Sequence, residues 1–133
     1  MATLASLAAK DYMTTKLVTF TPEMEVMTAI HQLVKNRLSG APVVDAAGKL
    51  IGVLSEKDCL KVALAAGYEG VPGGQVGEYM THEVSTVEPD MPMLEVASRF
   101  LGSPAKRFPV VRDGQLVGQI SRSDVMRAIS DVY

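Results

Sequence analysis

The sequence predicts an α/β protein built from two β-α-β-β-α repeats that pack together with approximate two-fold symmetry. The first observation is a recurrence of short motifs: Tyr79-Met80-Thr81 repeats Tyr12-Met13-Thr14, and Phe108-Pro109-Val110-Val111 repeats Ala41-Pro42-Val43-Val44, each 67 positions apart. The second is that each copy contains the pattern Gly-x-x-Ser-x-x-Asp, where its last strand runs into its last helix. One copy of about 55 residues has too small a core to be comfortably stable alone, so the copies should share their apolar faces.

The two copies differ in length only inside a turn. Residues 45–49 connect the paired strands of the first copy, and residues 112–115 connect those of the second, one residue shorter. Asp113-Gly114 is a strong signal for a tight turn, because both residue types tolerate positive φ. A length change confined to a turn, with the register kept on both sides, indicates a true structural repeat.

The chain divides into four expected segments. Residues 1–10 are rich in Ala and Leu, with apolar residues at helical spacing, and predict an N-terminal helix. Residues 11–68 form the first repeat and residues 77–133 the second. Between them, residues 69–76 contain three glycines and a proline and predict a flexible linker.

Within the first repeat, each element has a local signal. Residues 17–20 predict a short strand, and Thr21-Pro22-Glu23 predicts a helix start with threonine as the N-cap. That helix should run to Asn36 and bury one apolar face, made of Val26, Met27, Ile30, Leu33 and Val34. A break at Ser39-Gly40 precedes a hairpin of residues 41–44 and 50–54. A second helix should begin at Ser55, end at Ala66 and bury Leu60, Val62 and Ala63.

Composition excludes several classes of protein. Of the 133 residues, 47% are hydrophobic and 21% charged, which is typical of a globular domain. No apolar run approaches the roughly 20 residues of a membrane span, and the N-terminus lacks the pattern of a signal peptide. One cysteine excludes an internal disulfide and is compatible with a cytoplasmic location. The net charge of −2 argues against a nucleic-acid footprint. No metal-ligand spacing or catalytic triad can be assembled, so we expect no enzyme.

The repeated Ser-x-x-Asp pattern has two interpretations. Ser55 with Asp58, and Ser121 with Asp124, each match a capping box, in which the serine caps the helix and the acid reaches back to the cap amide. The same residues can bind a nucleotide, because a carboxylate suits a vicinal diol and helix-start amides suit an anion. The two roles are compatible, and the pattern alone leaves both open.

The ordered set of motifs, present twice, resembles a tandem pair of cystathionine-beta-synthase (CBS) domains. The resemblance covers about Asp11 to Ala128, and we expect no further domain to be attached. It implies a regulatory module that binds AMP, ADP, ATP, NAD or S-adenosylmethionine in clefts between the repeats and modulates a partner protein. It implies that Asp58 and Asp124 accept the ribose hydroxyls, and that Ser55 and Ser121 hold a phosphate or a ribose oxygen.

The resemblance also implies which residues line the clefts. In the first copy these are Thr15, Lys16, Val18, Ser39, Gly40, Ala41 and Lys57. In the second copy they are His82, Glu83, Val84, Lys106, Arg107, Phe108, Arg122 and Ser123. In this family a cleft usually combines the aspartate of one copy with walls from the other, so the pairing stays open.

The two copies are expected to bind unequally. Lys106, Arg107 and Arg122 make the second copy the more basic one, and a phosphate is better held there. We therefore expect the Asp124 site to dominate. The alternative function is a dimerisation or protein-interaction module with vestigial clefts, in which the helices after Ser55 and Ser121 and the Ala-rich N-terminus form a homodimer face.

Overall fold

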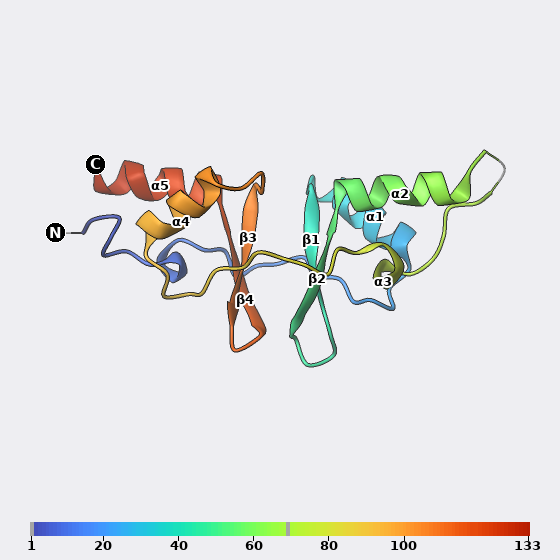
Figure 1. Ribbon diagram of the computed structural model, residues 1–133, viewed down its shortest axis with the longest axis horizontal. Helices are drawn as coiled ribbons and strands as arrows, with labels where there is room; N and C mark the ends of the chain where they lie inside the picture. Colours follow the sequence, from blue (N-terminus) through green and yellow to red (C-terminus); the bar gives the residue numbers. More distant parts are fainter. Residues whose placement is uncertain (1, 69) are drawn as a thin grey trace. The chain divides into compact units, whose positions relative to one another are not determined.

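The computed structural model describes residues 2–68 and 70–133, and these residues form two compact units (Figure 1). One unit comprises Val18–Val84, and the other joins the chain up to Leu17 to Ser85–Tyr133. Met1 and Glu69, the first residues of the expected N-terminal helix and linker, lie outside the described residues. The mixed α/β class and the two repeats are as predicted, and each unit is described below by itself.

The Val18–Val84 unit contains a hairpin and three helices. They follow the chain as α1 (Val26–Lys35), β1 (Gly40–Val44), β2 (Leu50–Ser55), α2 (Glu56–Ala66) and α3 (Val76–Tyr79). β1 and β2 pair antiparallel, with Gly40 opposite Ser55. The hairpin therefore ends where α2 begins, and α2 packs on β2 and α3.

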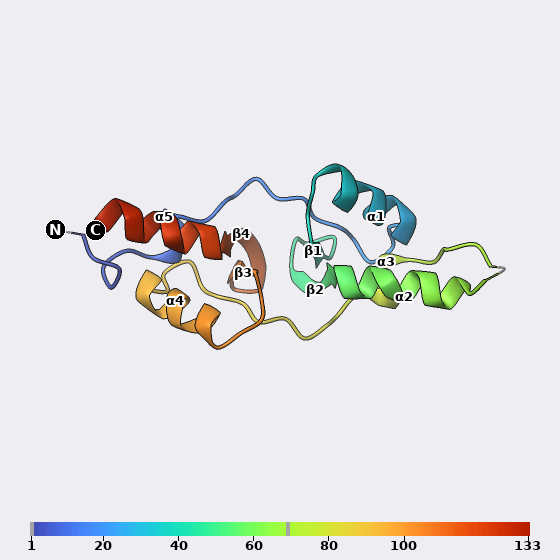
Figure 2. The ribbon, with the colours of Figure 1, turned by 90° about the horizontal axis from the view of Figure 1, so that it is seen from above.

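The other unit repeats this plan. It contains η1 (Ala9–Asp11), α4 (Met93–Leu101), β3 (Arg107–Arg112), β4 (Gln115–Ser121) and α5 (Arg122–Val132). Arg107 lies opposite Ser121 in the antiparallel hairpin, and Asp113 and Gly114 have φ values of 51° and 82°, as the predicted tight turn requires. α4 packs beside α5, as Figure 2 shows.

Each hairpin is crossed by the Tyr-Met-Thr segment of the other repeat. Thr14 forms a bridge with Gln119 of β4, and Thr81 forms one with Val53 of β2. The crossing explains the repeated glycine: a Cβ on Gly118 would lie 2.9 Å from the Thr14 carbonyl oxygen and 2.6 Å from Met13 Sδ. Gly52 has the same relation to Thr81, at 2.8 Å. Each compact unit is thus completed by a segment from the other repeat.

The prediction of a helix over residues 1–10 is wrong for the described residues. Residues 4–6 form a turn, and only the short 3-10 helix η1 follows. Part of the backbone here bonds to a distant segment: the Ala9 amide donates to the Met91 carbonyl at 2.9 Å, and the Met93 amide donates to the Leu7 carbonyl at 2.8 Å. These long-range bonds use the groups that a helix would have paired internally.

The start of the first long helix is also later than predicted. α1 begins at Val26, with Glu25 at the N-cap position, and Pro22 lies in a turn. Residues 24–26 are held by Gly74 and by the first residue of α3, since the Val26 amide donates to the Gly74 carbonyl and the Val76 amide donates to the Met24 carbonyl. The expected strand over residues 17–20 is reduced to one parallel bridge between Phe20 and Val43.

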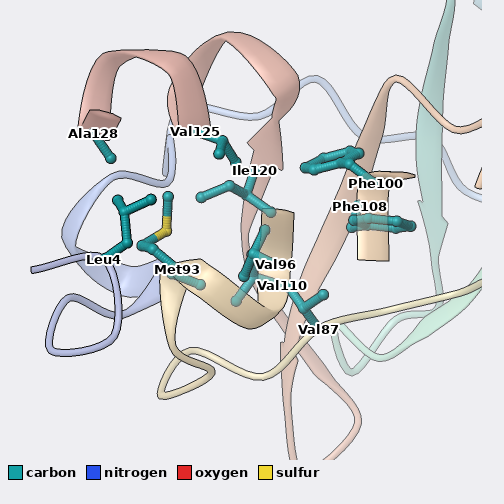
Figure 3. Packing of buried hydrophobic residues seen from close by; sticks show 11 residues of the cluster. Leu4, Val87, Met93, Val96, Phe100, Phe108, Val110, Ile120, Val125 and Ala128 are labelled. Atoms are coloured by element: carbon teal, nitrogen blue, oxygen red, sulfur yellow. The ribbon is translucent and has the colours of Figure 1, made fainter. Parts of the chain in front are cut away.

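Each unit has its own hydrophobic core. In the unit that contains α4 and α5, Phe100 stacks on Phe108 with ring centroids 4.4 Å apart (Figure 3). This core consists of Leu4, Ala9, Val87, Met93, Val96, Phe100, Phe108, Val110, Ile120, Val125 and Ala128. The other core consists of Phe20, Val26, Ala29, Leu33, Ala41, Val43, Leu54, Val62 and Val76.

Two predicted apolar faces need correction. Val34 of α1 is 73% exposed, because it lies at the edge of the stripe centred on Val26, Ala29 and Leu33. In α2 the inner face carries Val62 and the fully buried Asp58, whereas Leu60 is 68% exposed. Ala63 is exposed as well. α2 thus turns an acid inward and leucine outward.

In the described part of the chain, no helix is long and apolar enough to span a membrane.

Candidate functional site

Both Ser-x-x-Asp patterns form the capping boxes that the sequence predicted. Ser55 Oγ accepts from the Asp58 amide at 3.2 Å, and Asp58 Oδ2 accepts from the Ser55 amide at 2.9 Å. Ser121 and Asp124 repeat this arrangement at 3.2 and 2.8 Å. The hairpin positions each serine, because the last residue of β2 or β4 is also the helix N-cap. Each aspartate is therefore held in one orientation at the start of an 11-residue helix.

Asp58 is buried and fully engaged. Its Oδ1 accepts from Lys61 Nζ at 2.9 Å, and Thr81 Oγ1 lies 3.1 Å from both carboxylate oxygens. Ser55 Oγ adds a further bond to Oδ2 at 2.9 Å. Burial opposes ionisation of Asp58, but the hydrogen bonds from Ser55, Lys61 and Thr81 outweigh it and hold its pKa below the usual value. The Asp58 carboxylate is thus ionised, with little acceptor capacity left.

Asp124 is the more available of the two carboxylates. Its side chain is 14% exposed, against 2% for Asp58. Oδ2 serves the capping box and also accepts from Ser121 Oγ at 3.0 Å, whereas Oδ1 accepts from Arg127 Nη1 at 3.0 Å. The hydroxyl of Thr14, the counterpart of Thr81, forms no bond to Asp124 within the described residues. A carboxylate oxygen has about two lone-pair sites, so Oδ1 retains one for an outside donor.

The first residues of the two helices carry opposite charges. Arg122 opens α5 at the position where Glu56 opens α2. Arg122 Nη2 donates to the Ser103 carbonyl at 3.2 Å, and its amide donates to the Lys106 carbonyl, also at 3.2 Å. In each unit, the carbonyl of the residue before the hairpin therefore accepts a hydrogen bond from the first amide of the following helix. In the other unit this is the bond from the Glu56 amide to the Ser39 carbonyl.

Arg107 adds a second cation beside Ser121. The two residues are cross-strand partners, so their side chains project from the same face of the hairpin. The Arg107 Nε atom is buried and has no hydrogen-bond partner in the described part of the chain. The equivalent position in the other hairpin is Gly40, where a Cβ would lie 2.9 Å from the Leu54 carbonyl oxygen. A cation at this hairpin position is thus present in the Asp124 unit only.

The structure distributes the remaining predicted residues between the units. Thr15 and Lys16 are exposed and belong to the unit of Asp124, as do the exposed Lys106 and Ser123. The unit of Asp58 holds Val18, Ser39, Lys57, His82, Glu83 and Val84. Two predicted wall residues are core residues: Ala41 is 2% exposed and Phe108 1% exposed. Only the backbone atoms of Ala41 and Phe108 are therefore available to a ligand.

The residues that contact the two aspartates from outside their motifs were missed by sequence reasoning. They are Thr81 and Lys61 at Asp58, and Arg127 at Asp124. A signal was present, since Thr81 belongs to the repeated Tyr-Met-Thr motif. Lys61 and Arg127 also occupy one repeat position, three residues after each aspartate. A basic residue one turn after an acid in both copies indicates that the two side chains form a pair in each copy.

The described residues contain no group of three His, Cys, Asp or Glu side chains positioned to hold a metal ion. Burial raises the pKa of the Cys59 thiol, and Asp58 and Glu56 raise it further, which disfavours the reactive thiolate.

Comparison with known proteins gives a family match over both repeats. The CBS domain model matches residues 9–65 and 76–131. The crystal structure of CBSX2 of Arabidopsis thaliana in complex with AMP is similar, with a TM-score of 0.81 and 29% identity over 94% of this chain and 97% of that one. The CBS domain pair of MJ0100, in complex with 5'-methylthioadenosine and S-adenosyl-L-methionine, has a TM-score of 0.77 and 28% identity over 96% and 98% of the two chains.

Among curated proteins, the A-adding tRNA nucleotidyltransferase of Aquifex aeolicus is 28% identical over 125 residues. The match covers 94% of this chain and 15% of that enzyme. The chain therefore spans a small part of that relative's length.

Proposed function

The chain belongs to the CBS domain family, and from this premise we propose that it is a regulatory module for an adenosyl ligand. The ligand class comprises AMP, ADP, ATP, NAD and S-adenosylmethionine, and its binding changes the fit of the module to a partner protein. The observation that carries the proposal is the fixed, partly exposed Asp124 carboxylate at a junction of hairpin and helix that also carries Arg107 and Arg122. The complexes of CBSX2 with AMP and of MJ0100 with two adenosyl compounds support it.

The proposed primary site is the one at Asp124. The free lone pair of its Oδ1 is suited to a ribose hydroxyl, which donates a hydrogen bond to an ionised carboxylate. Ribose binding at Asp58 would have to displace Thr81 or Lys61, which already occupy its acceptor positions. The sequence ranked the sites by their nearby cations, and carboxylate availability supports the same order.

The cations at this site favour a phosphate. The unpartnered Arg107 Nε is a donor that a phosphate oxygen can satisfy, and Arg122 adds charge at the positive end of α5. Of the first three amides of α5, those of Arg122 and Asp124 are engaged, which leaves the Ser123 amide for an outside acceptor. In the other unit Glu56 would repel a phosphate at the corresponding place.

Calorimetric titration with AMP, ATP, NAD and S-adenosylmethionine tests the proposal. Asp124→Asn keeps the size of the side chain and should weaken AMP binding at least tenfold, with a smaller effect for Asp58→Asn. Arg122→Glu installs the charge found at Glu56 and should weaken ATP binding more than S-adenosylmethionine binding. Circular dichroism controls for folding of each variant. No binding of any of the four ligands at millimolar concentration would refute the proposal.

A second candidate function, a homodimeric interaction module, has one specific observation in its favour. Leu60 and Leu64 lie one turn apart on α2 and are 68% and 84% exposed, and Met126 of α5 is 69% exposed. Sedimentation of the wild type against Leu64→Glu, with the exposed Ala65→Glu as control, tests it. A monomeric wild type at micromolar concentration contradicts it.

A further inference from the structure

The segment of residues 8–14, here called the N-terminal strap, is bound to the unit that contains Asp124. Its Ala9 and Lys10 amides donate to the carbonyls of Met91 and Pro89, both at 2.9 Å. At its other end, Thr14 exchanges two backbone hydrogen bonds with Gln119, at 2.9 and 3.0 Å. The strap is thus an early part of the chain held beside the start of α5 by a few backbone bonds.

Arg127 joins this strap to Asp124. Its Nη1 donates to Asp124 Oδ1 at 3.0 Å, and its Nη2 donates to the Tyr12 carbonyl at 3.0 Å. The guanidinium also lies over the Tyr12 ring, 5.3 Å from the centroid, as a cation–π contact. Tyr12 Oη in turn donates to Asp131, near the end of α5, at 2.8 Å. One guanidinium therefore touches the candidate ligand acceptor and the strap at once.

The other unit connects the corresponding groups differently. There Thr81, the counterpart of Thr14, bonds directly to Asp58, and Lys61, the counterpart of Arg127, also donates to Asp58. Tyr79, the counterpart of Tyr12, donates through its hydroxyl to the Gly73 carbonyl at 3.0 Å. A lysine is a point charge, whereas the forked arginine can serve two acceptors. The connection through a guanidinium is thus a feature of the Asp124 unit.

We infer that Arg127 is a positioning residue that couples occupancy of Asp124 to docking of the N-terminal strap. This rests on the proposed function for the identity of the ligand, but not for the connection itself. A ligand hydroxyl on Asp124 requires the carboxylate orientation that the capping box and Arg127 hold together, and Arg127 is at the same time bound to Tyr12. Because coupling between two sites is reciprocal, a bound ligand must then stabilise the docked strap to the same extent as the strap favours the ligand. Docking of the strap therefore depends on whether a ligand occupies the site.

Hydrogen exchange of the ligand-free protein tests the connection. In Arg127→Lys, the lysine can still pair with Asp124, as Lys61 does with Asp58, but it gives up the Tyr12 carbonyl. We expect the amides of Ala9, Lys10 and Thr14 to exchange about 5–10-fold faster in this variant and in Asp124→Asn. The matched control Lys61→Met should leave these amides unchanged. Unchanged strap exchange in both Arg127→Lys and Asp124→Asn would overturn the inference.

A second arm adds AMP at saturation. In the wild type AMP should slow exchange of the strap amides several-fold, whereas in Arg127→Lys it should bind about 5–10-fold more weakly and give no added strap protection. Equal protection in both proteins would overturn the coupling even though AMP binds. If AMP, ATP, NAD and S-adenosylmethionine all fail to bind the wild type, the proposed function and the ligand coupling both fall. Faster strap exchange in the variants would then still establish the connection through Arg127.

Discussion

Substituting Gly118 by alanine tests the way in which each hairpin is completed by the other repeat. The added Cβ would lie 2.6 Å from Met13 Sδ and 2.9 Å from the Thr14 carbonyl oxygen. Met13 can move, because its thioether is flexible, but the Thr14 backbone is held by its two bonds to Gln119. Either the hairpin accepts the overpacking or the Thr14–Gln119 bridge opens.

Both outcomes reduce stability by a similar amount. Overpacking costs about 1–3 kcal/mol, and losing two backbone hydrogen bonds costs about 0.5–1.5 kcal/mol each. We therefore expect Gly118→Ala to lower the free energy of unfolding by about 2–3 kcal/mol. For a unit of this size, that loss corresponds to a fall in Tm of roughly 10–20 °C.

Urea and thermal unfolding followed by circular dichroism measure this loss. Gly102→Ala is the matched control in the same unit, because a Cβ there meets only ordinary contacts at 3.8 and 3.9 Å. The double variant Met13→Ala/Gly118→Ala should recover only part of the loss, since the carbonyl contact remains. Equal stability of Gly118→Ala and Gly102→Ala would refute the crossing as the reason for this glycine.

Two further predictions concern the buried carboxylate and the aromatic core. Because the pKa of Asp58 is lowered in the folded protein, the stabilisation it provides is complete above its unfolded pKa of about 3.9. That stabilisation is lost as the pH falls through the folded pKa. The free energy of unfolding of Asp58→Asn should therefore depend less on pH below about pH 4 than that of the wild type. Identical pH dependences of the two proteins would contradict this. Phe108→Ala removes one ring of the buried stack with Phe100 and should cost about 3–5 kcal/mol in urea unfolding. Leu101→Ala, at a side chain that is 92% exposed, should cost less than about 0.5 kcal/mol, and equal losses would contradict the assigned core.

Several features of the fold could be predicted from local sequence because local interactions decide them. The capping boxes at Ser55 and Ser121 need only residues three positions apart, and the structure contains both. The Asp113-Gly114 turn follows from the positive φ that those residues tolerate. The repeat itself was visible because motifs recur in order at a nearly constant spacing.

The predictions that failed concern segments in which contacts with a distant part of the chain replaced a local interaction. The Ala-rich N-terminus has good helix propensity, yet its amides bond to Met91 and Pro89, and propensity is a weak prior against such contacts. The expected N-cap at Thr21 failed for a similar reason, because residues 24–26 pair with the segment around Gly74. Periodicity also could not show that α2 would bury Asp58 and expose Leu60.

The sequence by itself determined the duplicated α/β plan, the family resemblance and the two carboxylates at helix starts, because each depends on residues close together in one copy. Only the tertiary structure decided how the two carboxylates differ. Thr81 and Lys61 occupy the acceptor positions of Asp58, whereas Asp124 is held through Arg127 to Tyr12 and keeps an acceptor free. Thr81 reaches Asp58 from 23 positions away, and Tyr12 accepts from Arg127, the partner of Asp124, across 115 positions. Contacts at such separations are set by the packing of each unit, which no spacing within one motif encodes.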